Sequence, residues 1–197
     1  VLDTEDNPPD RMMEIYEARA EYIRAADAGD PNARDMAYMH MPERRTGQVG
    51  AEQARYVIDA LAANPDVRWT FLFMHKPVWQ TEPLDEDFAA IESALADRPY
   101  TVFNGHYHVY DRAERLGRDY ITLATTGGSQ NHASDMAFDH VTLVTVGGGW
   151  PPEAAESAAP HIAPPTIATL RMDGILDAGA RVPAGGDTLC FQASRCD

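Results

Sequence analysis

Apolar and polar positions in the first hundred residues switch between helical and continuous patterns. Apolar side chains at helical spacing predict three helices, over residues 12–26, 54–61 and 88–95. Continuous apolar runs at 69–74 and 100–103 are typical of short strands buried on both faces. The resulting order of helix, strand, helix and strand predicts an α/β fold.

Beyond residue 108 the pattern becomes that of β-structure. Further strands are predicted over residues 109–115, 119–125, 141–146 and 166–171. Asp173-Gly174 signals a two-residue hairpin turn. Helices are therefore expected only in the first part of the chain.

The chain divides into two parts by composition. Residues 1–146 carry the α/β pattern, and residues 147–197 form a flexible connection rich in Gly, Pro and Ala, followed by a β-hairpin extension. An insertion occupies about 7–48; its residues 32–46 show no clear period, which favours an ordinary surface insertion over a lid on a site. Val1-Leu2 resembles the end of a buried strand, so we expect that an upstream segment has been removed.

Charge and cysteine usage narrow the possible partners. Sixteen basic against thirty-one acidic residues give a net charge of −15, which argues against binding to nucleic acid. No apolar run approaches the ~20 residues of a membrane helix, so no membrane span is expected. Cys190 and Cys196 form either a local disulfide, which would favour a periplasmic or secreted protein, or two thiols of a cytoplasmic one.

Three of the seven histidines lie where two predicted strands end. His75 follows the run 69–74, and His106 and His108 follow the run 100–103. Ligands of open α/β sheets bind beyond the carboxyl ends of strands. In an extended chain, residues two apart point to one face about 6 to 7 Å from each other, so two such imidazoles can converge on two metal ions. We therefore predict that the three histidines are metal ligands.

Several segments resemble those of the metallophosphoesterases, also called calcineurin-like phosphoesterases. In chain order these are residues 2–4, 50–53, 75–77 and 105–108. The sequence GHYHVYDR at 105–112 is similar to that of the purple acid phosphatase branch. The resemblance covers roughly residues 1–146.

The resemblance implies that the chain is the C-terminal half of a two-sheet α/β/β/α sandwich that hydrolyses phosphate mono- or diesters at a dinuclear metal centre. His75 and His106 would bind the second ion and His108 the first, the ions being Mn, Fe or Zn. The family's other ligands come from Asp-x-His, Gly-Asp-x-x-Asp and Gly-Asn-His motifs, which this chain lacks. We therefore expect a missing N-terminal half to supply them, and this chain alone to be inactive.

Residues around the histidines are candidates for substrate binding. Tyr107, Tyr110 and Arg112 adjoin the predicted ligands, and a guanidinium can bind phosphate through a bidentate pair of hydrogen bonds. The alternative for these three side chains is strand packing and a surface ion pair. Both alternatives stay open on the sequence alone.

Two other functions remain open as well. The chain could be a non-catalytic scaffold module, because a fold does not dictate an activity. It could also hold a mononuclear structural zinc ion, with Asp111 as a fourth ligand beside the histidines. In the truncated phosphoesterase that the resemblance implies, the absent strands would leave a sheet edge uncovered, which favours a homodimer through that edge.

Overall fold

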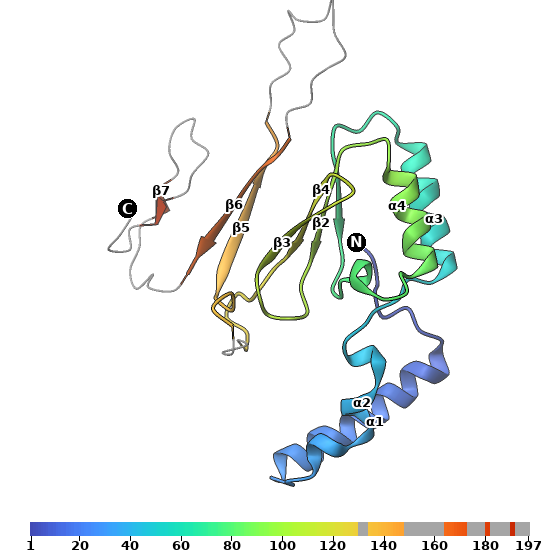
Figure 1. Cartoon of the computed structure of the whole chain (residues 1–197), viewed down its shortest axis with the longest axis vertical. Helices are drawn as coiled ribbons and strands as arrows, with labels where there is room; N and C mark the ends of the chain where they lie inside the picture. Colours follow the sequence, from blue (N-terminus) through green and yellow to red (C-terminus); the bar gives the residue numbers. More distant parts are fainter. Residues whose placement is uncertain (130–133, 148–163, 173–179, 182–189, 192–197) are drawn as a thin grey trace, which may run out of the picture. The chain divides into compact units, whose positions relative to one another are not determined.

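The computed structural model describes residues 1–129, 134–147, 164–172, 180–181 and 190–191 (Figure 1). The chain forms two compact units. The first unit comprises residues 1–106 and 113–121, and the second comprises residues 107–112 and 122–197. Cys196, the predicted partner of Cys190, and the predicted Asp173-Gly174 turn lie outside the described residues.

A four-stranded mixed sheet is central to the first unit, and it confirms the predicted α/β class. Its order is β1 (Thr70–Phe73), β2 (Tyr100–Asn104), β4 (Arg118–Thr122) and β3 (Asp111–Arg115). β1 and β2 are parallel, and Thr70 pairs with Tyr100. β3 and β4 form a hairpin whose turn residues Leu116 and Gly117 have φ angles of 54° and 67°, as a type I′ turn requires.

Helices α3 (Ala51–Ala63) and α4 (Glu86–Leu95) lie side by side next to this sheet (Figure 1). Asp85 precedes α4, and its side chain caps the helix by accepting a hydrogen bond of 2.8 Å from the Phe88 backbone N–H. The apolar stripes of both helices pack on one face of the sheet. The resulting core contains Leu2, Ala54, Leu72, Val78, Phe88, Ile91, Leu95, Tyr100, Val102 and Tyr120.

The insertion is more regular than its sequence suggests. It consists of α1 (Pro9–Asp27), η1 (Ala33–Asp35), α2 (Ala37–His40) and η2 (Pro42–Arg44). Residues 32–46 were expected to be irregular, and that expectation is wrong because three short helical turns are each too brief to show a period. The rings of Tyr22 in α1 and Tyr38 in α2 lie 5.6 Å apart and join the two helices. Among the helices of the described ranges, none combines the length and apolarity needed to cross a bilayer.

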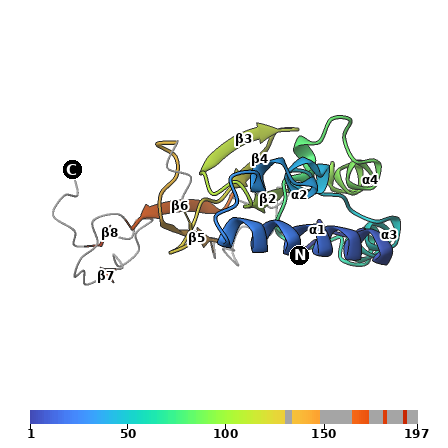
Figure 2. The ribbon, with the colours of Figure 1, turned by 90° about the horizontal axis from the view of Figure 1, so that it is seen from below.

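The second unit contains an antiparallel pair of strands, β5 (His140–Thr145) and β6 (Thr166–Arg171) (Figure 2). Two shorter strands, β7 (Ala180–Arg181) and β8 (Cys190–Phe191), also pair in an antiparallel fashion. The ring of Phe138 packs against His140, with 5.5 Å between ring centroids, and the Arg171 guanidinium lies 4.3 Å from the Phe138 ring. Aromatic and cation–π contacts therefore stabilise the start of this strand pair.

Candidate functional site

The ends of β1 and β2 bring His75 and His106 into contact. Because the two strands are parallel neighbours, both carboxyl ends lie at the same edge of the sheet. The Gly105 backbone N–H donates a hydrogen bond of 3.0 Å to the His75 carbonyl and fixes the two loops together. The His75 Nε2 and His106 Nδ1 atoms lie 3.1 Å apart, and the rings are nearly perpendicular at 82°.

The hydrogen bonds of His106 determine which nitrogen of each ring carries hydrogen. His106 Nε2 lies 2.9 Å from the Arg44 carbonyl oxygen, which can only accept, so Nε2 is the donor. Burial is the main cause that lowers the pKa of His106 below its usual 6.5, so the ring is neutral at neutral pH. Its Nδ1 then has a lone pair and accepts from His75 Nε2–H. A single hydrogen bond therefore joins the two nitrogens that face each other.

This pair of nitrogens has the spacing of two ligands on one metal ion. For metal–nitrogen bonds of about 2.05 Å, neighbouring ligands lie about 2.9 Å apart in octahedral and about 3.3 Å apart in tetrahedral geometry. The observed 3.1 Å falls between these values. The Arg44 carbonyl accepts from the far side of the His106 ring, which is how metal-binding imidazoles are usually oriented. The separation of the two nitrogens therefore fits a shared ion, provided that His75 moves its hydrogen from Nε2 to Nδ1 so that Nε2 can bind.

The backbone at the two neighbouring histidines is not extended. His106 and His108 have φ angles of 77° and 56°, and residues 106–109 form bends. The expectation that an extended chain points both rings to one face is therefore wrong, and β3 begins at Asp111 rather than at residue 109. Left-handed residues other than glycine are uncommon and are concentrated at ligand-binding sites.

His108 belongs to the second unit. Its Nδ1 lies 2.5 Å from the Ser129 carbonyl oxygen, which can only accept, so Nδ1 is the donor of this hydrogen bond. The side chain is thus oriented by a backbone acceptor, as His106 is. In the described ranges, no three His, Cys, Asp or Glu side chains form a group that could hold a metal ion.

The predicted substrate-binding residues lie on the bends and on β3. Tyr110 packs its ring 5.8 Å from that of Phe138 and 5.7 Å from that of His140, the contacts that the strand-packing alternative predicts. Tyr107 is 38% exposed. Arg112 and Asp111 are exposed at the start of β3.

A cavity of about 290 Å³ opens beside the two contacting histidines. One side is formed by the sheet edge and the residues next to it, and the other by the insertion. The lining residues are Glu5, Asn7, Met12, Ile15, Tyr16, Arg19, Tyr38, Glu43, Arg44, His75, Lys76 and His106. The insertion, expected to be an ordinary surface segment, therefore supplies most of the wall of a cavity.

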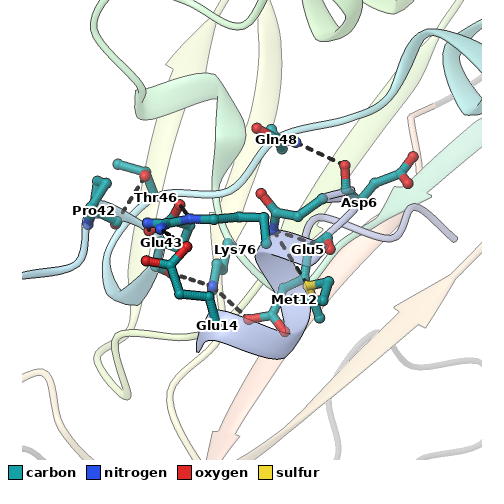
Figure 3. A network of polar contacts seen from close by, with 11 residues as sticks. Glu5, Asp6, Met12, Glu14, Pro42, Glu43, Thr46, Gln48 and Lys76 are labelled. Carbon is teal, nitrogen blue, oxygen red and sulfur yellow. Dashed lines mark hydrogen bonds and ion pairs between the residues drawn. The ribbon is translucent and has the colours of Figure 1, made fainter. Parts of the chain in front are cut away.

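A polar network anchors the insertion to the end of β1 (Figure 3). The Lys76 side chain is buried, and its Nζ lies 2.5 Å from both a Glu5 carboxylate oxygen and the Glu43 carbonyl oxygen. The Glu43 carboxylate accepts two hydrogen bonds, of 2.7 and 2.8 Å, from Arg11 of α1. The Lys76 ammonium lowers the pKa of Glu5, and the Arg11 guanidinium lowers that of Glu43. Both carboxylates are thus held in their charged form.

Sequence reasoning missed three participants in this site. Lys76 stands directly after His75, yet a lysine before a proline is no sign of burial. Glu5 reaches the site because Leu2 lies beside Met74 at the end of β1, which is a long-range contact. Arg44 contributes a backbone carbonyl to His106, and no residue type signals such a role.

Comparison with known proteins adds no relative. No protein-family model, no curated protein and no solved structure matches the chain.

Proposed function

We propose that the chain is the C-terminal part of a metal-dependent phosphoesterase and supplies imidazole ligands to a dinuclear centre that hydrolyses phosphate esters. The observation that carries the proposal is the 3.1 Å separation of the His75 and His106 nitrogens at the ends of two parallel strands. The left-handed backbone of His106 and His108 supports it, because such strain is typical of ligand sites. The two-sheet sandwich is part of the same proposal.

Each histidine has a distinct part in this proposal. His75 Nε2 and His106 Nδ1 would hold one ion, and His108 Nε2 would serve the other. Mn, Fe or Zn ions, when bound, would neutralise phosphate charge and lower the pKa of a coordinated water. The Arg44 carbonyl orients the His106 ring, and the Ser129 carbonyl orients that of His108. A dinuclear centre also needs a bridging carboxylate, which these three histidines do not supply.

A zinc titration of the chain tests the histidine contact directly. We expect His75→Ala and His106→Ala each to weaken zinc binding at least tenfold, measured by isothermal calorimetry at pH 7. His40→Ala is the matched control, because His40 is an exposed histidine of α2 outside the cavity lining. Zinc binding that neither site substitution weakens would contradict the proposal.

Activity is tested in the parent protein with both halves present. We expect His106→Ala to abolish hydrolysis of 4-nitrophenyl phosphate, and an unchanged rate would refute the phosphoesterase assignment. Metal stoichiometry separates the alternatives. Two ions support the dinuclear enzyme, one ion without turnover supports a structural site, and none supports a scaffold.

A further inference from the structure

Helix α1 turns an apolar stripe toward the cavity instead of burying it in a core. The helix has 19 residues, and none of them is buried. Its residues Met12, Ile15, Tyr16 and Arg19 recur at helical spacing and all line the cavity. An amphipathic helix ordinarily buries such a stripe against another element. This stripe instead forms a wall opposite the histidines.

The charges in the cavity favour an anion, although the whole chain carries a net charge of −15. The Lys76 ammonium is neutralised by Glu5, and Glu43 is neutralised by Arg11. Of the lining residues, Arg19 and Arg44 remain, and among the described residues their guanidinium groups have no ion-pair partner. Two guanidinium groups in one cavity can bind a phosphate dianion through charge-assisted hydrogen bonds.

Two tyrosines supply an aromatic wall near these cations. Tyr16 is 53% exposed, so its ring is available for contact. Tyr38 also lines the cavity, and its ring is positioned by Tyr22 at 5.6 Å. Offset or edge-on packing against such rings favours planar aromatic groups. A volume of about 290 Å³ limits the ligand to a small molecule.

We infer that the cavity binds small aromatic phosphate monoesters, with the phosphate on Arg44 and Arg19 and the aromatic ring against Tyr16 and Tyr38. Arg44 lines the cavity, and its backbone carbonyl is hydrogen-bonded to His106, so this residue lies at the histidine end of the cavity. The insertion is then the element that selects the leaving group. The choice of phosphate among possible dianions rests on the proposed function.

Binding of two esters to the metal-free chain tests this inference. Dissociation constants of phenyl phosphate and ethyl phosphate are measured by NMR titration in the presence of EDTA, so that no metal contributes. We expect phenyl phosphate to bind about fivefold more tightly, the difference that one or two ring contacts provide. Equal affinities for the two esters would overturn the inference.

Substitutions of Tyr16 test whether its ring causes the preference for phenyl phosphate over ethyl phosphate. Tyr16→Leu is expected to remove the preference for phenyl phosphate, whereas Tyr16→Phe retains the ring and the preference. Tyr56→Leu is the control, because Tyr56 is 74% exposed on α3 and lies outside this cavity. A Tyr16→Leu variant that keeps the preference and a native circular dichroism spectrum would contradict the inference.

A substitution of Arg19 tests, in the same assay, whether its guanidinium binds the phosphate group of the ester. Arg19→Gln should weaken both esters about tenfold, because it removes a charged hydrogen bond common to them. Arg55→Gln on the exposed face of α3 is the matched control. Weak ester binding together with histidine-dependent zinc binding would refute this inference alone. Ester preference without histidine-dependent zinc binding would refute the metal centre alone.

Discussion

Two polar clusters of the first unit differ in how completely they are satisfied. The Glu92 cluster comprises Glu92, Tyr100, Arg115 and Tyr120. Arg115 donates two hydrogen bonds of 2.8 Å to the buried Glu92 carboxylate, and the Tyr120 hydroxyl donates a third of 2.7 Å. Burial raises the pKa of Tyr120, so this hydroxyl remains a donor. Every member of this cluster has its partner within the protein.

The cavity cluster is only partly satisfied. Lys76 and Glu5 are paired, but Arg19 and Arg44 line open space beside the two histidines. A fully partnered cluster stabilises the fold, whereas charges that face a cavity can interact with a ligand. The two clusters differ in the satisfaction of their hydrogen bonds, rather than in burial or charge alone, and this difference separates a structural cluster from a candidate site.

The largest effect on stability is expected from the Glu92 cluster. Glu92→Ala should lower the free energy of unfolding by about 3 kcal/mol, because it leaves Arg115 and Tyr120 without their acceptor. Urea denaturation measures the change, and zinc and ester binding by the folded protein should be unaltered. Glu114→Ala, an exposed carboxylate on β3, is the control. A loss no larger than that of the control would contradict the structural role.

A smaller loss of stability is expected when Lys76, which holds both Glu5 and the Glu43 carbonyl, is replaced. Lys76→Met should lower the free energy of unfolding by about 2 kcal/mol, since the Glu5 side chain, at 45% exposure, can be hydrated when its partner is removed. The pKa of Glu5 should rise toward its usual 4.5, which carboxyl NMR titration would report. A loss exceeding that of Glu92→Ala would reverse the ranking of the two clusters.

The smallest effect is a pH dependence confined to the cavity cluster. Because burial lowers the pKa of His106 below 6.5, the unfolded chain binds more protons than the folded chain between that lowered value and 6.5. The stability of the metal-free chain should therefore fall as the pH drops below 6.5. Urea denaturation between pH 5 and 8 measures this slope.

A variant assigns the slope to this imidazole. His106→Gln should flatten the dependence, whereas His40→Gln should preserve it. A second fall is expected at lower pH, where Glu5 and Glu43 protonate. Their pKa values lie below 4.5, so the stabilisation they provide is present above 4.5 and is lost as the pH falls through the lowered values. If His106→Gln leaves the pH dependence of stability unchanged, another group causes that dependence.

Periodicity predicted the regular elements well because each of them buries a repeating face. The stripe from Ala54 to Leu61 lies within α3, and the predicted strand 166–171 coincides with β6. Glu92 lies in α4 beside the buried apolar residues Phe88, Ile91 and Leu95. Its partner Arg115 lies 23 residues further on, and that pairing depends on tertiary packing.

Only the part of the candidate site that lies at the ends of strands could be predicted from the sequence. The convergence of His75 and His106 follows from parallel neighbouring strands, but the left-handed backbone of His106 and His108 does not follow from any local pattern. The cavity itself depends on the insertion folding back, through contacts such as that between Arg44 and His106, which are 62 residues apart. A hydrophobic pattern carries no information about backbone acceptors at that separation.

The bond from His106 to the Arg44 carbonyl has a consequence for assembly of the proposed metal centre. The ring is attached to the sheet, while its acceptor belongs to the helical insertion. If η2 detaches, the imidazole is free to rotate about its side-chain bonds and to exchange the nitrogen that it offers to an ion. Metal affinity should then report on docking of the insertion, and occupancy of the centre should in turn protect the amide hydrogens of η2 from exchange with solvent.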